Sequence, residues 1–431
     1  MYSDKEKEEN NFVYHRFSDS NSDEKHTKLI LTTNDKEISL DEKTEKKKKS
    51  KKKSKKKSKK FIKFGDEKDP QKPNNLFLVT SDEWKLEESD DEDDEIHNNE
   101  DIFNFEEKPT IFSTNFQGKE YSTFVTYHPN KKYMLFCITE SPIEDSELYK
   151  LLIISKEEPK YQTIHESQVS KSCWRSCCCM SPGYKDIIKH TDSLLKNANI
   201  LKTDCSEEDL IALENPTTAT KFKFGVIYVK PGQTDEYKIL ANSQTSEEFE
   251  IFLQEIGEKI ELKTFTGYVG GLDQKFGSAG THSIYTKWHD LDIMFHVSTL
   301  FPVSEDNYQQ LDKKRHIGND VVVIVFMEPN AQYNPETMPS QQNHVLIGIQ
   351  PVRLSNKKDL YFRIQIASKS CVPEFFPKLP SQTLISQKNL KDFLLTKAIR
   401  GDQAALKSGV FAQRFDKFKK FKLKSLLLNK N

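Results

Sequence analysis

Six consecutive apolar residues, VVVIVF at 321–326, have the length of one strand and offer no polar face. Such a strand must be covered on both sides, as a central strand is when helices flank its sheet. Similar strand-length runs are KFKFGVIYVK at 221–230, IMFHVST at 293–299, HVLIGIQ at 344–350 and YFRIQI at 361–366. Helical segments lie between these runs. Residues 219–402 are therefore expected to form an α/β domain with a central sheet flanked by helices.

A smaller α+β domain is expected over residues 103–218. YSTFVTYH at 121–128, YMLFCIT at 133–139 and LYKLLIIS at 148–155 have strand character, and HPNKK between the first two is typical of a turn. YKDIIKHTDSLLKNANIL, residues 184–201, has the spacing of an amphipathic helix. The polar, proline-containing segment ENPTTAT at 214–220 divides the two domains.

Charge is segregated in the first 102 residues. KKKKSKKKSKKKSKK occupies 46–60 and LEESDDEDDE occupies 86–95, and neither run has enough apolar side chains to offset the entropy of ordering. Residues 1–102 are therefore predicted to be a disordered charged tail. The lysine run is either a solvated spacer or a patch for an anionic membrane or nucleic acid, of which nucleic acid is the less favoured.

No stretch of the sequence has the length and apolarity of a membrane span or a secretory signal. Seven cysteines without regular spacing argue against a disulfide framework. Cytoplasmic localisation is expected, with recruitment to a membrane left open. For the cluster CWRSCCC at 173–179, zinc, lipidation and buried thiols are the alternatives, and buried thiols are favoured because adjacent cysteines cannot all face one ion.

The C-terminal segment 403–431 combines Phe411, Phe415 and Phe418 with many lysines. A helix would sort these residues into an apolar face and a cationic face. A basic amphipathic helix is predicted, which either packs on the domain or docks on a partner or a membrane surface.

Two helices are predicted within the larger domain. TSEEFEIFLQEIGEKI, residues 245–260, has a capping box of Thr245 and Glu248. SEDNYQQLDKKRHIGND, residues 304–320, has Ser304 and Asp306 as cap candidates and Gly318 as its terminator. Cationic residues in its last turn complement the negative end of the helix, which is a sufficient structural explanation. The other interpretation is that this helix-to-strand corner holds side chains toward a partner.

Independent catalytic chemistry has little support in the sequence. The glycine-rich segment GYVGGLDQKFGSAGTH at 267–282 lacks the Gly-Lys-Ser/Thr ending of a nucleotide-binding loop, so an ordinary flexible loop is expected. His289 and His296 have no metal-binding spacing and are expected to be core or surface histidines. No Ser/His/Asp or paired-carboxylate pattern is present, and no enzymatic activity of the chain by itself is expected.

Five blocks in order carry a resemblance to a known family: GEKIELKTFTGYVGGLD, SIYTKW, IMFHVSTLFP, QQLDKKRHIGNDVVVIVF and DFLLTKAI. Together they resemble the GTPase-activating domain of Rap-specific activators, a more distant relative of which is the tuberin type that acts on Rheb. The resemblance covers residues 222–400 and extends more weakly through 103–218. It implies a GTPase activator for a Rap-like small G protein.

The resemblance also implies roles for individual residues. Asn319 matches the family's asparagine thumb, which enters the nucleotide site of the G protein and positions the attacking water. His316 matches a functionally required histidine, and Arg315 matches a residue that supports the thumb helix. Lys314 and Lys223 match lysines that hold the GTPase, and Gln233 matches a polar position near the partner. For the last three and for Arg315, a solvated or internally bonded side chain remains the alternative.

The expected partner is a GTP-bound Rap-family GTPase, which itself binds GTP and Mg²⁺, so the chain needs no cofactor of its own. A homodimer through 103–218 is implied by the family, and an anionic membrane is expected to meet 46–60 or the C-terminal helix. The competing interpretation is a catalytically inactive scaffold that docks the GTPase through the same surface without accelerating hydrolysis.

Overall fold

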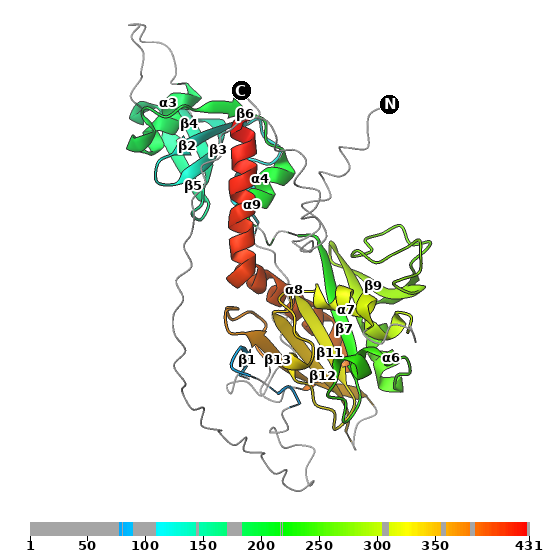
Figure 1. Ribbon diagram of the computed structural model, residues 1–431. Helices are drawn as coiled ribbons and strands as arrows, with labels where there is room; N and C mark the ends of the chain where they lie inside the picture. The colour runs from blue at the N-terminus through cyan, green and yellow to red at the C-terminus, as the bar shows by residue number, and fades with distance from the viewer. Residues whose placement is uncertain are drawn as a thin grey trace, which may run out of the picture. The chain divides into compact units, whose positions relative to one another are not determined.

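The computed structural model describes residues 77–79, 81–88, 109–143, 146–169, 183–215, 217, 219–303, 310–354, 359–379 and 384–428. They form two sheets with their covering helices (Figure 1). The lysine run at 46–60 and the cysteines at 173–179 lie outside these residues, as does most of the acidic run. No helix of the described residues combines the length and apolarity needed to cross a bilayer.

The larger sheet is mixed. Its strands, in spatial order, are β1 (Trp84–Leu86), β13 (Leu360–Lys369), β12 (Val345–Arg353), β11 (Val322–Met327), β7 (Lys221–Val229), β10 (Leu291–Val297), β9 (His282–Trp288) and β8 (Glu258–Glu261), while β14 (Leu384–Ser386) pairs with β13. β7 is parallel to both β10 and β11, and β11 is parallel to β12. The remaining pairs are antiparallel.

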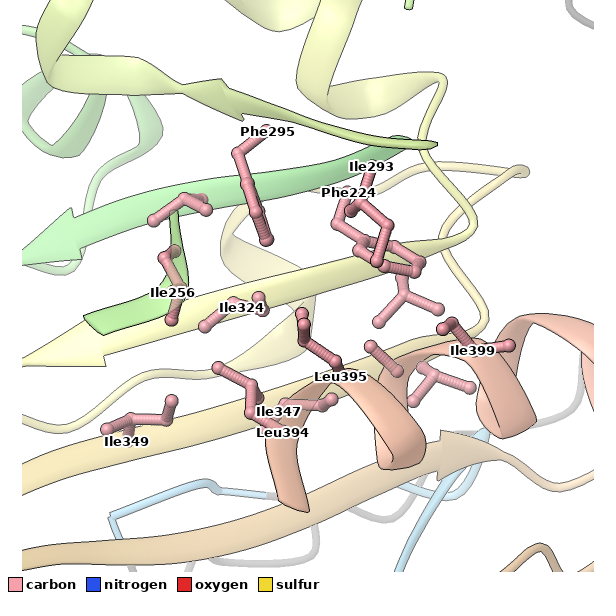
Figure 2. Packing of buried hydrophobic residues seen from close by; sticks show 14 of the residues in the cluster. Phe224, Ile256, Ile293, Phe295, Ile324, Ile347, Ile349, Leu394, Leu395 and Ile399 are labelled. Carbon is pink, nitrogen blue, oxygen red and sulfur yellow. The ribbon is translucent and has the colours of Figure 1, made fainter. Parts of the chain in front are cut away.

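Both faces of this sheet are covered, as its continuous apolar strands predict. On one face, Phe224, Phe295 and Ile324 pack toward helices α6 (Glu247–Ile256) and α8 (Gln387–Leu406), and Figure 2 shows the contact with α8. On the other face, a second core contains Val323 and Ile317, with contributions from α5 (Glu236–Leu240) and α7 (Leu311–Gly318). The expected α/β architecture is confirmed.

The smaller sheet is antiparallel throughout. Its strands, in spatial order, are β5 (Lys160–His165), β4 (Ser146–Ile154), β3 (Lys132–Ile143), β2 (Ser122–His128) and β6 (Leu201–Thr203), and its helices are α2 (Ile111–Asn115), α3 (Tyr184–Thr191) and α4 (Glu207–Glu214). The C-terminal helix α9 (Gly409–Leu428) contributes Leu423 and Leu426 to one core of this sheet. This finding supports the packed interpretation of the C-terminal segment for that face of the helix.

The N-terminal segment departs from its prediction. Residues 77–79 and 81–88 were expected within the tail, yet β1 pairs with β13, and Phe77 and Leu78 are buried. The Gln365 carboxamide oxygen accepts the backbone N–H groups of both residues, at 3.1 and 3.0 Å. The tail prediction is wrong for this segment because its order comes from burial against a distant sheet, which local composition does not reveal.

Helix boundaries also differ. Ser246, not Thr245, caps α6 by accepting the Phe249 N–H, because the helix begins one residue later than expected. α3 ends at Thr191, whereas its helical pattern continues to 201 in the sequence. α8 continues to Leu406, so the expected domain boundary after residue 402 falls inside a helix. The cap candidates Ser304 and Asp306 lie outside the described residues.

Candidate functional site

Helix α7 connects two strands that flank β7, and it ends where β11 begins. It packs on the face of β7 that includes Gly225. A Cβ atom at Gly225 would lie 3.3 Å from the Ile317 side chain and 3.2 Å from the Asp320 carboxylate. The absence of a side chain there lets the end of the helix approach the sheet closely.

Hydrogen bonds fix the backbone of this corner. The Asn319 N–H donates to the His316 carbonyl at 3.1 Å, and the Asp320 N–H donates to the Ile317 carbonyl at 3.2 Å. From outside the helix, the Asn343 carboxamide donates to the Ile317 and Asp320 carbonyls at 3.0 and 2.6 Å. Asn343 thus gives the Asp320 carbonyl a donor and adds a second donor to the Ile317 carbonyl at the helix end. The corner is therefore held by side chains of the larger domain as well as by its own turn.

Asn319 combines a backbone fixed by hydrogen bonds with a side chain that has no hydrogen-bond partner among the described residues. It is the residue that ends α7, with φ −98° and ψ 1°, and it is partly exposed. Its carboxamide makes no hydrogen bond to any residue that the structure describes, whereas the carboxamides of Asn242 and Asn343 are bonded internally. A carboxamide offers donors and an acceptor together, so Asn319 is available to orient a polar group of a partner.

Beneath the corner lies a buried pair, His296 and Asp320, both 0% exposed. His296 Nδ1 is 2.8 Å from the Asp320 carboxylate, and Nε2 is 3.0 Å from the Gly270 carbonyl oxygen. The carboxylate and the carbonyl oxygen are both acceptors, so each nitrogen of the buried ring faces a hydrogen-bond acceptor. Lys223 Nζ lies 3.8 Å from the other carboxylate oxygen. One carboxylate is thus shared by a histidine and a lysine.

The ring of His316 stands beside this pair, 5.2 Å from the His296 ring and 5.3 Å from the Phe301 ring. Burial lowers the pKa of His316 to about 4, and the positive charges of His296, Lys223 and Arg315 act in the same direction, against the Asp320 carboxylate. His316 is therefore neutral at physiological pH, with one ring nitrogen as donor and the other as acceptor.

The cations of α7 divide by burial. Lys313 is buried and donates from Nζ to the Leu240 carbonyl at 2.7 Å, and desolvation lowers its pKa to about 8. Lys314 is partly exposed and pairs with Glu236, with Nζ to carboxylate oxygen at 2.8 Å. Arg315 is exposed. Lys313 therefore anchors the helix to α5, while Lys314 and Arg315 remain accessible on the surface.

Gln233 lies in the turn after β7, and its contacts are internal. Its oxygen accepts the Lys230 N–H at 2.8 Å, and its nitrogen donates to the Lys238 carbonyl at 3.1 Å and to Asn242 at 3.0 Å. Through these hydrogen bonds, the Gln233 side chain stabilises the turn that follows β7. Its role at a partner surface stays a prediction.

The structure therefore brings Asn319, His316, Arg315 and Lys314 to one helix end, with Lys223 next to it through Asp320. The sequence interpretation missed Asn343, Asp320 and the special position of His296. A polar residue within the apolar strand IMFHVST was the available signal for a buried, paired histidine. No cluster of three His, Cys, Asp or Glu side chains suited to a metal occurs within the described ranges.

Comparison with known proteins matches residues 239–420 to the family described as Rap/ran-GAP. A PH and Rap-GAP domain-containing protein of Dictyostelium discoideum is 39% identical over 237 residues, which cover 53% of this chain and 20% of that protein. GTPase-activating Rap/Ran-GAP domain-like protein 3 of Homo sapiens is 41% identical over 212 residues, covering 48% of this chain and 20% of that protein.

RapA guanosine triphosphatase-activating protein 1 of Dictyostelium discoideum is 33% identical over 283 residues, covering 53% of this chain and 27% of that protein. The chain thus spans between 20% and 27% of the length of these three relatives. A solved structure titled "Structure of the TSC2 GAP domain" is 34% identical in sequence, covering 43% of this chain and 97% of that chain, with a TM-score of 0.38.

Proposed function

Because residues 239–420 carry a domain of the Rap/ran-GAP family, we propose that the chain is a GTPase-activating protein for a Rap-like small G protein. Asn319 is the residue that it inserts into the partner's nucleotide site. The observation that supports this role is the combination of a backbone fixed by helix-end hydrogen bonds and a partly exposed carboxamide without a hydrogen-bond partner among the described residues. A purely structural asparagine would be bonded internally, as Asn343 is.

The chemistry suits a carboxamide. It accepts from and donates to a water molecule at the same time, and it does not titrate, so it holds the attacking water in line with the γ-phosphate over a wide pH range. Groups supplied in trans to GTPases contribute roughly 10³ to 10⁵ in rate, equivalent to about 4–7 kcal/mol of barrier. GTP and Mg²⁺ belong to the partner, and the chain contributes no cofactor.

The neighbouring residues support the thumb in different ways. Neutral His316 adds no positive charge beside Asn319 and packs its ring against Phe301 and His296. Arg315 and Lys314 present cations on the exposed side of the same helix turn, where they attract the acidic surface of a GTPase. Lys223 offers a GTPase less contact surface than Arg315 or Lys314, because its side chain is only 22% exposed and its ammonium group faces Asp320.

Two further partners belong to this proposal. The smaller domain mediates a homodimer, and the chain meets an anionic membrane through its lysine-rich segments. The competing function is a scaffold that binds the GTPase without accelerating hydrolysis. The Asn319 carboxamide, which has no hydrogen-bond partner among the described residues, favours the GTPase-activating function over the scaffold. A surface that only docks a GTPase does not require a carboxamide held on a rigid backbone.

Single-turnover GTP hydrolysis by purified Rap, Rheb and Ras tests the proposal, with wild-type chain and with Asn319→Ala. Acceleration of Rap should fall by at least about a hundredfold in the variant, since misplacing such a group by about 1 Å already loses that much. Binding to Rap with a GTP analogue should change far less.

The matched control is Asn197→Ala, which removes an exposed asparagine of the smaller domain. In the presence of Asn197→Ala, Rap should hydrolyse GTP as fast as it does with the wild-type chain. If folded wild-type protein binds Rap without accelerating it, the scaffold is the correct function. If Asn319→Ala accelerates as well as wild type, the thumb assignment is wrong even though the chain is an activator.

A further inference from the structure

A cavity of about 500 Å³ lies on the smaller domain, between the sheet and α9. Its lining combines residues from the end of β2, the β2–β3 turn and the start of β3 with one residue between β4 and β5 and with residues of α9. Six of the lining residues are lysines, and one is an aspartate. The lining residues, hereafter the lysine pocket, are Tyr127, Lys131, Lys132, Tyr133, Lys156, Asp416, Lys417, Lys419, Lys420 and Leu423.

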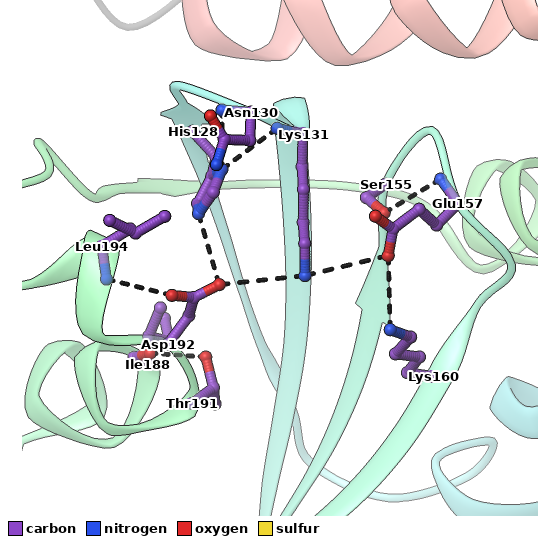
Figure 3. Close-up of polar contacts among 10 residues, drawn as sticks. All are labelled: His128, Asn130, Lys131, Ser155, Glu157, Lys160, Ile188, Thr191, Asp192 and Leu194. Carbon is purple, nitrogen blue, oxygen red and sulfur yellow. Dashed lines mark hydrogen bonds and ion pairs between the residues drawn. The ribbon is translucent and has the colours of Figure 1, made fainter.

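The positive charge of the lysine pocket is poorly neutralised. Lys131 lies between two carboxylates, with Nζ 3.8 Å from both Glu157 and Asp192 (Figure 3). For the other five lysines, no carboxylate of the described part of the chain lies within 4.0 Å of the ammonium group. Lysines outnumber carboxylates six to one in the pocket lining, although Lys156 and Lys419 also line a neighbouring hollow that contains Glu157 and Glu158.

Lys419 is the second observation that points to a ligand. It is 6% exposed, and its nearest described partner is the Phe415 ring, with the centroid 4.9 Å from Nζ. Desolvation lowers the pKa of Lys419, while Glu158 and Asp416 act in the opposite direction. No carboxylate of the described residues pairs with this ammonium group within 4.0 Å, so an anion in the pocket would offset its desolvation at close range.

We propose that the lysine pocket binds an inositol ring that carries several phosphates, the headgroup of a phosphoinositide. Cations surround the cavity from both the sheet and the helix, which suits several phosphates on one ring better than a single phosphate. Its volume is in the range of small-molecule sites. Tyr127 and Tyr133, paired across the two strands with ring centroids 5.4 Å apart, offer flat apolar walls and hydroxyl donors.

The exposed face of α9 favours a lipid source over a free inositol phosphate. Phe421 is 72% exposed and Leu428 is 54% exposed, and Lys420 and Lys424 lie beside them on the helix. Apolar side chains set among lysines are typical of helices that rest at a membrane interface. This site is separate from Asn319, and the inference does not depend on GTPase activation.

Binding of the full chain to vesicles containing phosphatidylinositol bisphosphate tests the proposal, with phosphatidylserine vesicles of equal charge and soluble inositol hexakisphosphate as separate arms. Lys156→Gln/Lys420→Gln removes one exposed cation from the sheet side and one from the helix side. Lys259→Gln/Lys263→Gln, at exposed positions of the larger domain, is the matched control. All variants keep residues 46–60, so nonspecific attraction to that run is equal among them.

The pocket variant should bind bisphosphate vesicles about tenfold or more weakly than the control. Lys419→Met should weaken binding similarly while its melting temperature stays equal to or above the wild-type value, because it removes a partly desolvated charge that has no carboxylate of the described residues within 4.0 Å. Binding of inositol hexakisphosphate without bisphosphate vesicles would keep the ligand class but assign a soluble source.

Equal binding by the pocket variant and the control would overturn the proposal. So would equal wild-type affinity for the two vesicle types, because charge alone would then explain binding. Single-stranded oligonucleotide binding that is lost in the pocket variant, with no inositol phosphate binding, would assign the pocket to nucleic acid instead.

Discussion

Replacing Asp320 by asparagine should destabilise the protein far more than replacing its neighbour Asn319 by alanine. Asp320 is fully buried, bonds to the His296 ring at 2.8 Å and lies 3.8 Å from Lys223. The carboxamide keeps the size of the side chain but removes the only negative charge facing the His296 ring and the Lys223 ammonium group in the described part of the site. The Asn319 side chain, in contrast, is partly exposed and has no internal hydrogen bond among those residues.

The expected magnitudes differ by several kcal/mol. Removing one partner of a buried ion pair costs roughly 3–5 kcal/mol, whereas surface substitutions away from special contacts stay within about 0.5 kcal/mol. For a domain of about 200 residues, each kcal/mol shifts the melting temperature by about 2–4 °C. Asp320→Asn should therefore melt about 6–20 °C below wild type, and Asn319→Ala within about 2 °C of it.

Thermal unfolding followed by circular dichroism measures this difference, with urea unfolding as a second measurement. The double variant His296→Gln/Asp320→Asn checks the cause, because removing both partners of this contact should cost less than the sum of the single losses. An Asp320→Asn protein with the melting temperature of wild type would refute the stabilising role of this buried contact. Strictly additive losses of unfolding free energy in the double variant would refute it as well.

Three further outcomes are expected. Asn343→Ala should lose about 1–3 kcal/mol of unfolding free energy in urea, since it leaves the Asp320 carbonyl without its donor and removes one of the two donors to the Ile317 carbonyl. Its GTPase acceleration should fall more than that of Asn197→Ala. Unchanged acceleration would show that the corner does not need the Asn343 side chain. Burial holds the pKa of His316 at about 4, below its usual 6.5, so the unfolded chain takes up a proton first as pH falls and stability is lost below about pH 6.5. The loss from this group between pH 7 and pH 5 is on the order of 2 kcal/mol, and His316→Gln should show correspondingly less acid destabilisation; an identical pH profile would contradict the burial effect. Lys314→Ala should raise the concentration of chain needed for half-maximal hydrolysis without changing the maximal rate, and a curve that overlays wild type would remove Lys314 from the interface.

Local sequence was sufficient for the central sheet and for the corner. Strands such as VVVIVF are apolar on both faces, so burial on both sides follows from the residues themselves. The end of α7 was predicted to within one residue from the preceding cations, but Gly318 is the last helical residue, without a left-handed φ, and Asn319 caps the helix. The residues proposed for function on α7 therefore follow from sequence, through the blocks that resemble a known family.

Tertiary structure decided which distant groups meet. Phe77 and Leu78 are ordered by burial against β12 and β13, far from them in sequence, and their own composition gives no sign of it. His296 and Asp320 lie 24 residues apart, and neither spacing nor propensity identifies them as a pair. The lysine pocket likewise joins β-turn residues to a helix at the other end of the chain. Local patterns set periodicity and burial, whereas the partner of a buried charge depends on the packing of the whole domain.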